Sequence, residues 1–264
     1  RAADIAAVMT AEQGKPLAES LREVQLSADI IDFLAEESKR LAARGVPPRL
    51  ANVVSQTVQR VPVGPVAAFT PWNFPVNLPS RKIGGALAAG CSVIIKPDEE
   101  TPASSMELIR CFADAGLPAG VLNMVLGVPA EISDRLIAAP EVAKVSFTGS
   151  TSVGRMLGEK CARYLKRYTA ELGGHAPVIV CEDADPMAVA KLAVAAKFRG
   201  AGQVCASPIR FLVHKSIYET FKREFVKLAK ALKVGDGTEP GVQMGPLLAQ
   251  RRVEEMEALV ADAL

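Results

Sequence analysis

Apolar residues recur at helical spacing through the N-terminal part of the chain. One face collects Ala18, Leu21, Val24, Ala28 and Ile31. This periodicity predicts one or two amphipathic helices within residues 2–43, broken near Gly14-Lys15-Pro16 because glycine and proline interrupt helices. A glycine- and proline-containing loop at residues 45–48 follows. Valines among polar residues over 53–63 then predict extended strands.

From residue 66 onward, short apolar runs alternate with helical patterns. Buried strands are predicted at residues 66–69, 92–96, 121–125 and 142–147. Helices are predicted after them, at residues 80–89, 104–115, 131–138 and 153–165. Strands alternating with helices at this rhythm predict an α/β fold with a doubly wound parallel sheet. Ligands of such sheets bind at the carboxyl ends of the strands, so we expect functional residues just after each strand.

A second α/β pattern begins after Gly173-Gly174. It contains predicted strands at 177–180 and 209–213 and predicted helices at 187–199 and 216–232. We therefore expect one domain over residues 1–172 and a second over 173–264. Amphipathic patterns run to both ends of the chain without capping signals, so we expect a piece of a longer protein whose second domain is incomplete.

Composition and charge narrow the class of protein. The 264 residues are 49% hydrophobic and 23% charged, as in soluble globular domains, and the net charge of +2 creates no strong field for nucleic acid or an anionic membrane. The longest apolar stretch, near residues 83–95, is too short to span a bilayer. The five cysteines are widely spaced and form no CxxC pair, which argues against disulfides and a metal site and favours a reducing, cytoplasmic location.

Cys205 is the cysteine with a suggestive context. It follows Gly200 and Gly202, and glycines permit tight backbone geometry and close approach of a ligand. A thiolate there is a candidate nucleophile. The alternative is a small buried side chain, and that interpretation is kept for the other four cysteines.

Two further side chains suit the chemistry of a nucleophilic cysteine. Glu171 precedes Gly173-Gly174, and a carboxylate beside a glycine pair is a candidate general base; the alternative is a salt bridge at a strand end. Asn73 lies between Pro71 and Pro75, directly after the first strand of the predicted sheet. Its amide could donate to an oxyanion, or it could simply satisfy a rigid turn.

Two more loops after strands suit an anionic ligand. Lys96 ends the second strand and could contact ribose hydroxyls or phosphate, unless it is an ordinary solvated lysine. Gly149 and Ser150 lead into a helix whose free N–H groups favour an anion, although Ser150 could serve only as a helix cap. Neither a GxGxxG motif nor a P-loop is present.

Taken in order and spacing, these motifs resemble the aldehyde dehydrogenase superfamily over essentially the whole chain. Within it, the chain looks most similar to NAD(P)-dependent succinate-semialdehyde dehydrogenases. The motifs are Pro71-Trp72-Asn73-Phe74-Pro75, Lys96-Pro97 with Thr101-Pro102, Phe147-Thr148-Gly149-Ser150, Glu171-Leu172-Gly173-Gly174 and Gly202-Gln203-Val204-Cys205.

The resemblance implies a mechanism with covalent catalysis. Cys205 would attack the aldehyde to form a thiohemiacetal, and hydride transfer to the nicotinamide would leave a thioester. Asn73 and the backbone N–H of Cys205 would hold the oxyanion. Glu171 would activate the water that hydrolyses the thioester.

The resemblance also implies a dinucleotide in the domain of residues 1–172, with 173–264 as the catalytic domain. The matching cofactor positions are Phe69, Thr70, Pro71, Trp72, Lys96, Glu99, Gly149 and Ser150. Glu99 should repel a 2′-phosphate, so we expect NAD, with NADP as the alternative. The loop at 127–133 departs from the family because it lacks a second glycine that many members carry.

Arg81 and Arg199 match arginines that bind the distal carboxylate in succinate-semialdehyde dehydrogenases. Two guanidinium groups suit a carboxylate, which implies succinate semialdehyde or a similar carboxylated aldehyde. The alternative is that Arg81 is a helix-surface residue and Arg199 a salt-bridge partner. Ser207 replaces a cysteine, and Gly200 an asparagine, that relatives carry; the glycine is expected to loosen the loop of the nucleophile.

Residues 48–63 match strands that project from this fold for assembly, so a homodimer or homotetramer is expected. Two other functions remain open. One is a truncated, non-catalytic fragment that binds a nucleotide or assists assembly. The other is a cofactor-independent cysteine enzyme of the acyl-transfer or ester-hydrolysing type, although only His175 and His214 could serve it as a histidine base.

Overall fold

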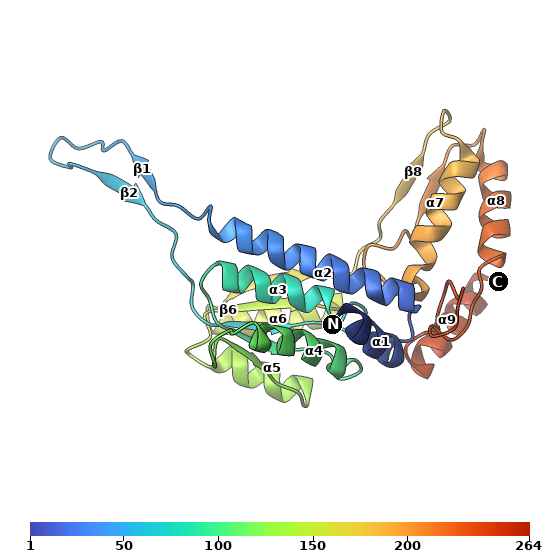
Figure 1. The fold of residues 1–264 in the computed structure, drawn as a ribbon. Helices are drawn as coiled ribbons and strands as arrows, with labels where there is room; N and C mark the ends of the chain where they lie inside the picture. The colour runs from blue at the N-terminus through green and yellow to red at the C-terminus, as the bar shows by residue number, and fades with distance from the viewer. The chain divides into compact units, whose positions relative to one another are not determined.

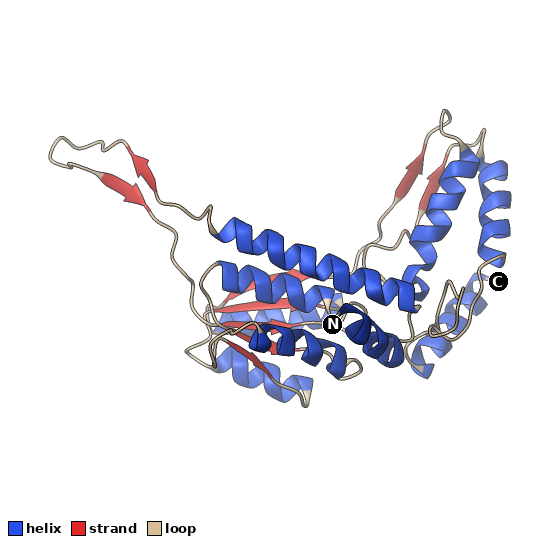
Figure 2. Ribbon diagram, viewed as in Figure 1, coloured by secondary structure: helices blue, strands red, loops and turns tan.

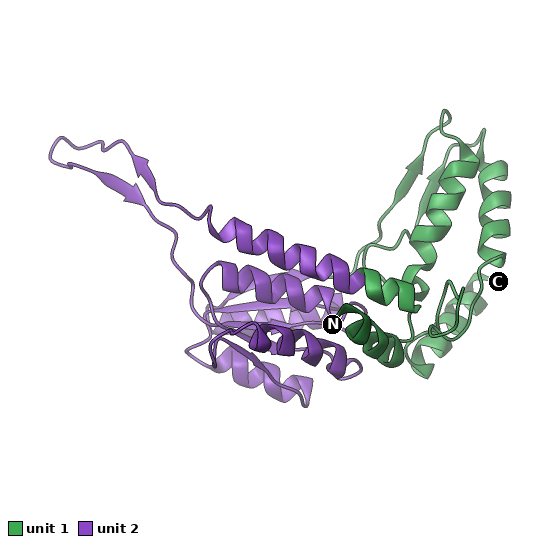
Figure 3. Cartoon of the chain, in the orientation of Figure 1, with its two compact units in different colours: residues 1–22, 172–264 green, residues 23–171 purple.

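The structure, a computed structural model, describes all 264 residues and divides the chain into two units (Figure 3). Unit 1 contains residues 1–22 and 172–264, and unit 2 contains residues 23–171. None of the helices combines the length and the apolar character that crossing a bilayer requires.

Unit 2 is built on a five-stranded parallel sheet with strand order β5-β4-β3-β6-β7. The strands are β3 (Val66–Phe69), β4 (Val93–Lys96), β5 (Leu122–Met124), β6 (Lys144–Thr148) and β7 (Arg167–Glu171). All four residues of the central strand β3 are buried, as the apolar run predicted. The chain builds the sheet outward from β3 through β4 to β5 and then returns to the other side of β3 with β6. The point where the order reverses therefore lies between β3 and β6, at their carboxyl ends.

Helices cover both faces of this sheet (Figures 1 and 2). They are α3 (Asn77–Ala88), α4 (Pro102–Asp114), α5 (Pro129–Ala138) and α6 (Thr151–Arg163). Helix α3 contacts the face that carries Ser146, because Lys82 of α3 donates to its hydroxyl at 2.9 Å. Helix α6 contacts the opposite face, where the Tyr168 hydroxyl donates to the carbonyl of Gly154 at 2.7 Å. The predicted doubly wound α/β fold is confirmed.

Two strands of unit 2 were not predicted. Strand β7 reads Arg-Tyr-Thr-Ala-Glu and alternates between exposed and half-buried positions at the sheet edge, so it lacks the apolar run of a central strand. Strand β1 (Arg44–Val46) falls in the predicted loop at 45–48 and pairs antiparallel with β2 (Gln56–Val58). This hairpin projects from the sheet (Figure 1). Val54, in the loop between its two strands, is fully exposed. The strands of the hairpin pair only with each other, so no buried face marks β1 in the sequence.

Unit 1 has a two-stranded parallel sheet of β8 (Val178–Val180) and β9 (Phe211–Val213). Its helices are α1 (Ala2–Gln13), the start of α2 (Leu17–Ser38), α7 (Pro186–Phe198), α8 (Tyr218–Lys230) and α9 (Gln250–Ala263), with a 3-10 helix η1 at Arg199–Gly202. Phe211, Phe221 and Phe225 pack with ring centroids 5.5–5.8 Å apart beside the buried Ala190 and Ala193. This cluster fixes α7 and α8 against β9, next to the loop that carries the candidate nucleophile.

The first 22 residues belong to unit 1, whereas the sequence-based division placed them with residues up to 172. The reason is a close fit between backbones. The Leu17 N–H donates to the Gly237 carbonyl at 2.9 Å. A Cβ on Gly245 would lie 1.9 Å from the carbonyl oxygen of Gly14, so this approach requires glycine. Local periodicity does not report such long-range contacts. It did predict the break between α1 and α2.

A buried carboxylate fixes the start of α3. The backbone N–H groups of Val76 and Asn77 both donate to Oε1 of Glu23 at 3.0 Å, and Glu23 is 4% exposed. Replacing Glu23 with alanine would leave both donors without this acceptor. We expect the free energy of unfolding to fall by about 2–4 kcal/mol, measured by urea denaturation.

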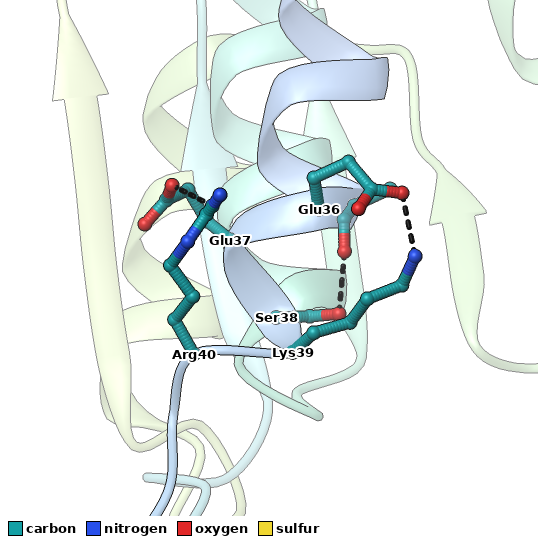
Figure 4. Close-up of polar contacts among 6 residues, drawn as sticks. Glu36, Glu37, Ser38, Lys39 and Arg40 are labelled. Carbon is teal, nitrogen blue, oxygen red and sulfur yellow. Dashed lines mark hydrogen bonds and ion pairs between the residues drawn. The ribbon is translucent and has the colours of Figure 1, made fainter.

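The C-terminal turn of α2, the helix that carries Glu23, offers a matched control. Glu36 pairs with Lys39 at 2.6 Å on an exposed surface, beside the pair of Glu37 and Arg40 (Figure 4). Exposed pairs contribute little because water already solvates both charges. Glu36→Gln should therefore cost less than about 1 kcal/mol. Equal losses in the two variants would contradict the capping role of Glu23.

Candidate active site

Asn73 lies in the turn between β3 and α3, at the carboxyl end of the central strand. The turn is held from two sides. Glu23 accepts from the backbone N–H of Val76, and the Ser105 hydroxyl donates to the carbonyl of Pro75 at 2.7 Å. Asn73 itself is half-buried, as are Pro71 and Trp72. The structure thus places the predicted oxyanion donor in a fixed turn at the predicted edge of the sheet.

Two buried hydroxyls at the same edge have no hydrogen-bond partner. They are Oγ1 of Thr70, directly after β3, and Oγ1 of Thr101, at the first turn of α4. Buried hydroxyls normally find a partner because leaving them unpaired costs free energy. These atoms therefore fit a polar ligand that would approach the carboxyl ends of β3 and β4.

Lys96 and Glu99 precede Thr101 in the sequence and form an ion pair with each other, and the carbonyl of Lys96 accepts from the Thr70 N–H at 3.3 Å. Lys96 is buried at the end of β4, while the Glu99 side chain is half exposed. In the same loop, burial raises the pKa of the Asp98 carboxyl above its ordinary value, and a hydrogen bond from the Glu100 N–H opposes that rise. The loop therefore offers one buried cation and one accessible carboxylate to a ligand that carries hydroxyls.

Gly149 and Ser150 form the turn between β6 and α6. A Cβ on Gly149 would lie 2.4 Å from the ring of Phe147, so only glycine lets this ring fold over the turn. The hydroxyl of Ser150 accepts from the Val153 N–H at 3.4 Å, so the expected helix cap is present. The backbone N–H groups of Thr151 and Ser152 lie in the first turn of α6. Backbone N–H groups in the first turn of a helix have no acceptor within the helix, so they can donate to an anion.

Glu171 ends β7 and lies next to this turn. Its backbone carbonyl accepts from the Gly149 N–H at 3.1 Å, and its partner in the sheet register is Thr148. The side chain is exposed. Within unit 2, the structure thus brings the candidate base and the candidate phosphate turn together at the carboxyl ends of β6 and β7.

Cys205 is exposed in a turn of unit 1 that follows η1. The preceding backbone is left-handed at three consecutive residues, with φ of 54° at Gly200, 55° at Ala201 and 75° at Gly202. Only glycine adopts these φ values without strain, so Gly200 and Gly202 allow the backbone to form this left-handed turn.

Hydrogen bonds on both sides of Cys205 hold this turn. The Gly200 N–H donates to Oε2 of Glu19 at 3.0 Å, and the Leu248 N–H donates to the side chain of Gln203 at 3.2 Å. Ser207, 2% exposed, donates to the carbonyl of Lys197 at 3.2 Å. Gly200 was expected to loosen the loop, but its backbone is anchored. The thiol is therefore presented to solvent on a constrained backbone.

Gly174 lies beside the backbone of the candidate nucleophile. A Cβ on Gly174 would lie 3.4 Å from the carbonyl oxygen of Cys205, and Gly174 follows Glu171 by three residues in the sequence. The two glycine motifs thus meet in unit 1.

The two candidate substrate arginines lie in different units, and each is exposed. The Arg81 guanidinium donates to Oδ1 of Asn77 at 3.0 Å, one turn earlier on α3. Arg199 terminates α7 and begins the left-handed turn that leads to Cys205.

The structure also reveals a residue that sequence reasoning missed. Lys82 of α3 is partly buried, and this burial lowers its pKa to about 8, with the charge of Glu171 acting in the opposite direction. The available signal was a lysine among the buried positions of α3, between Ser80 and Ile83. That signal is weak because lysines often bury their stems and expose their heads.

A family model described as the aldehyde dehydrogenase family matches residues 1–264, the whole chain. The chain belongs to the aldehyde dehydrogenase family.

Individual relatives agree with the family assignment. The chain is 51% identical over 257 residues to 4-(hydroxymethyl)benzenesulfonate dehydrogenase of Comamonas testosteroni, covering 97% of this chain and 53% of that protein. It is 43% identical over 261 residues to the succinate-semialdehyde dehydrogenase [NADP(+)] of Escherichia coli, covering 99% and 54%. A crystal structure of succinate-semialdehyde dehydrogenase from Burkholderia pseudomallei superimposes with a TM-score of 0.97 at 44% identity, over 99% of this chain and 54% of that one.

The resemblance drawn from the five motifs is therefore confirmed at the level of family and fold. The chain spans about half the length of the curated relatives it matches.

Proposed function

We propose that the protein containing this chain oxidises an aldehyde to a carboxylic acid with a nicotinamide dinucleotide, using Cys205 as nucleophile. The observation that carries the proposal is the constrained, solvent-facing turn at Cys205. Three left-handed residues and anchors at Glu19 and Ser207 hold an exposed thiol in place. A structural cysteine would be buried, as Cys91 and Cys161 are.

In the first half of the reaction, the Cys205 thiolate adds to the aldehyde carbon and the carbonyl oxygen becomes an oxyanion. The Asn73 amide, held in the turn after β3, and the backbone N–H of Cys205 would donate to that oxygen. These donors would cost little reorganisation because the Asn73 turn is already fixed by Glu23 and Ser105.

The polar groups at the carboxyl ends of β3, β4 and β6 suit a dinucleotide. The unpaired hydroxyls of Thr70 and Thr101 are available to it, and the turn at Gly149 and Ser150 presents helix N–H donors to its phosphates. When bound, the nicotinamide supplies the hydride acceptor that the thiohemiacetal requires, so that a thioester remains on Cys205.

In the second half, Glu171 would take a proton from water as that water attacks the thioester. Hydrolysis releases the acid and regenerates the thiol. The exposed side chain at the end of β7 leaves the carboxylate able to reach a water molecule. Gly173-Gly174, which runs beside the Cys205 carbonyl, gives this segment the freedom to place it.

We propose NAD as the preferred cofactor because Glu99 is half exposed beside the buried Lys96. A carboxylate there accepts ribose hydroxyls and repels a 2′-phosphate. Glu99→Ser should raise the ratio of kcat/KM for NADP over NAD by about tenfold or more. Initial rates with both cofactors measure it, with the adjacent Glu100→Ser as a charge-matched control. An unchanged ratio in Glu99→Ser would contradict the role of Glu99.

For the substrate, we propose an aldehyde with a distal anionic group, such as succinate semialdehyde or a similar carboxylated aldehyde. Arg81 and Arg199 are exposed and would bind that anion. One relative is named for a benzenesulfonate and another for succinate semialdehyde, and both of these compounds carry an anionic group.

Initial rates with the complete protein test the function and the substrate class together. The panel pairs succinate semialdehyde with butanal, and 4-formylbenzenesulfonate with benzaldehyde. We expect NADH production with at least one anionic aldehyde and at least about tenfold lower kcat/KM for its neutral analogue. Equal rates within both pairs would overturn the anion preference. Dinucleotide binding without turnover would overturn the dehydrogenase function in favour of a non-catalytic role.

We also propose that the β1–β2 hairpin pairs with a partner subunit in a homodimer or homotetramer. The hairpin exposes Val54, Val58 and Val61, and a two-stranded ribbon is marginal by itself. Sedimentation of the complete protein would show an oligomer, and deletion of residues 47–55 should shift it toward the monomer.

A further inference from the structure

The first turn of α3 holds the head of Arg81. Residues four apart on a helix lie on the same face, and helical side chains lean toward the N-terminus of their helix. Asn77 and Arg81 are four apart on α3, and the Nε–H of Arg81 donates to Oδ1 of Asn77 at 3.0 Å. The guanidinium is therefore held back over the first turn of α3, the helix that follows the Asn73 turn.

The amide of Asn77 is itself fixed from α2. The hydroxyl of Ser27, which is 1% exposed, donates its hydrogen to the carbonyl of Glu23 at 2.7 Å, so the Ser27 oxygen can only accept from Asn77. Nδ2 of Asn77 donates to that oxygen at 3.4 Å, and the Asn77 backbone N–H donates to Oε1 of Glu23 at 3.0 Å. This network turns the amide nitrogen toward Ser27 and the amide oxygen toward Arg81.

The partner of Arg81 carries no charge, unlike the partners of several other arginines. Arg81 forms no ion pair, and the first turn of α3 contains no acidic residue. Three other arginines pair with a glutamate three residues away. They are Arg40 with Glu37, Arg110 with Glu107 and Arg252 with Glu255. Asn77 thus holds a guanidinium in place without neutralising it.

A guanidinium held in this way suits an anion with two oxygens. Of its five N–H donors, the Nε–H is used by Asn77, and the two terminal amino groups retain the other four. These amino groups form a planar fork that matches a carboxylate or a sulfonate. The Arg81 side chain is exposed, so the fork is accessible. Because the long side chain is already ordered, binding the anion costs less conformational entropy.

We propose that Asn77 is a positioning residue for the anionic tail of the substrate. It holds Arg81 so that the two amino groups of the guanidinium bind that tail, and it thereby strengthens the preference for anionic over neutral aldehydes. This inference rests on the proposed substrate class. The neutrality of Asn77 matters as well as its hydrogen bond, because a carboxylate at position 77 would compete with the substrate for the guanidinium.

Asn77→Ala releases the guanidinium without changing its charge. In the complete protein, kcat/KM for succinate semialdehyde should fall by about three- to tenfold, mainly through KM, because binding must now order the Arg81 side chain. With butanal, which has no anionic tail, kcat/KM should stay within about twofold of the wild type. Asn123→Ala is the matched control, since the exposed Asn123 amide donates to the carbonyl of Gly120 at 2.8 Å in another part of unit 2. It should leave kcat/KM unchanged for both aldehydes.

A double-mutant cycle with Arg81→Met separates positioning from a structural role. If Asn77 acts through Arg81, adding Asn77→Ala to Arg81→Met should change kcat/KM for succinate semialdehyde by less than about twofold. Equal losses from Asn77→Ala in the two backgrounds would overturn the inference. An equal loss with butanal would also overturn it, because both results would show that Asn77 only supports the start of α3.

Asn77→Asp tests the requirement for a neutral partner. Aspartate keeps an oxygen in reach of Nε but pairs its charge with Arg81. We expect KM for succinate semialdehyde to rise by about tenfold or more, a larger effect than in Asn77→Ala, with KM for butanal unchanged. A wild-type KM for succinate semialdehyde in Asn77→Asp would contradict this part of the inference.

The wild-type rates separate this inference from the proposed function. The same variants are compared with 4-formylbenzenesulfonate and benzaldehyde as a second pair. Equal kcat/KM within both pairs for the wild type would overturn the proposed substrate class, and with it the role of Asn77. A wild-type preference for the anionic aldehyde that Asn77→Ala retains in full would overturn the role of Asn77 alone.

Discussion

Cys205→Ala is expected to lower kcat for aldehyde oxidation in the complete protein by about 10⁴-fold or more. Alanine offers no sulfur for the thiohemiacetal, so hydride transfer would have to occur from the free aldehyde, which carries no oxyanion to expel the hydride. The turn should survive because Gly200 and Gly202 keep its left-handed backbone and Glu19 keeps its anchor. Initial rates at saturating aldehyde and dinucleotide measure the loss.

Cys181 provides the matched control for this substitution. It is the other exposed cysteine of the chain, and it lies directly after β8, in a segment with no glycine turn. Cys181→Ala should leave kcat within about twofold of the wild type. Retained oxidation in Cys205→Ala, or loss of it in Cys181→Ala, would show that the wrong thiol has been assigned.

Glu171→Gln should lower steady-state kcat by about 10²–10⁴-fold and leave the first hydride transfer intact. Glutamine keeps the length of the side chain but accepts no proton from water, so the thioester accumulates. The expected kinetic trace is a burst of reduced cofactor, one per active site, followed by a slow steady state. Stopped-flow absorbance measures both phases.

A carboxylate elsewhere in unit 2 controls for loss of charge alone. Glu141 is exposed and lies in the connection that leads into β6. Glu141→Gln should give wild-type burst and steady-state rates. If Glu171→Gln lost the burst together with the steady state, Glu171 would act before thioester formation, which the proposed mechanism does not allow.

Local sequence patterns were sufficient for most of unit 2. The strand at 66–69 is a continuous apolar run because both of its faces are covered, and such runs stand out in any sequence. The predicted first residues of the helices were less accurate. Helix α3 begins at Asn77 rather than at residue 80, because the carboxylate of Glu23 accepts the N–H groups at its start. A contact over more than 50 residues leaves no trace in local periodicity.

The features that the sequence did not reveal depend on tertiary contacts or on exposed edges. Strand β7 contains only alternate apolar residues because it is an edge strand. The place of residues 1–22 in unit 1 depends on a backbone fit at Gly245 that no residue pattern encodes. Lys82 was missed because its importance comes from burial against Ser146, 64 residues later.

The candidate site was predicted residue by residue through motifs rather than through geometry. The structure places Asn73, Lys96, Gly149 and Glu171 at the carboxyl ends of strands, as the α/β rule requires, and places Cys205 on a glycine turn. Substrate choice depends on side chains such as Arg81 and Arg199 that the fold leaves exposed, so neither periodicity nor packing constrains it.

One measurement tests the central claim most directly, because it sees the covalent intermediate itself. The Glu171→Gln variant of the complete protein is mixed with succinate semialdehyde and NAD, quenched in acid, digested and examined by mass spectrometry. We predict one succinyl group on the peptide that contains Cys205, present only when aldehyde and dinucleotide are both supplied. An unmodified Cys205 peptide after a full burst of NADH, or a succinyl group on Cys181 instead, would contradict the account.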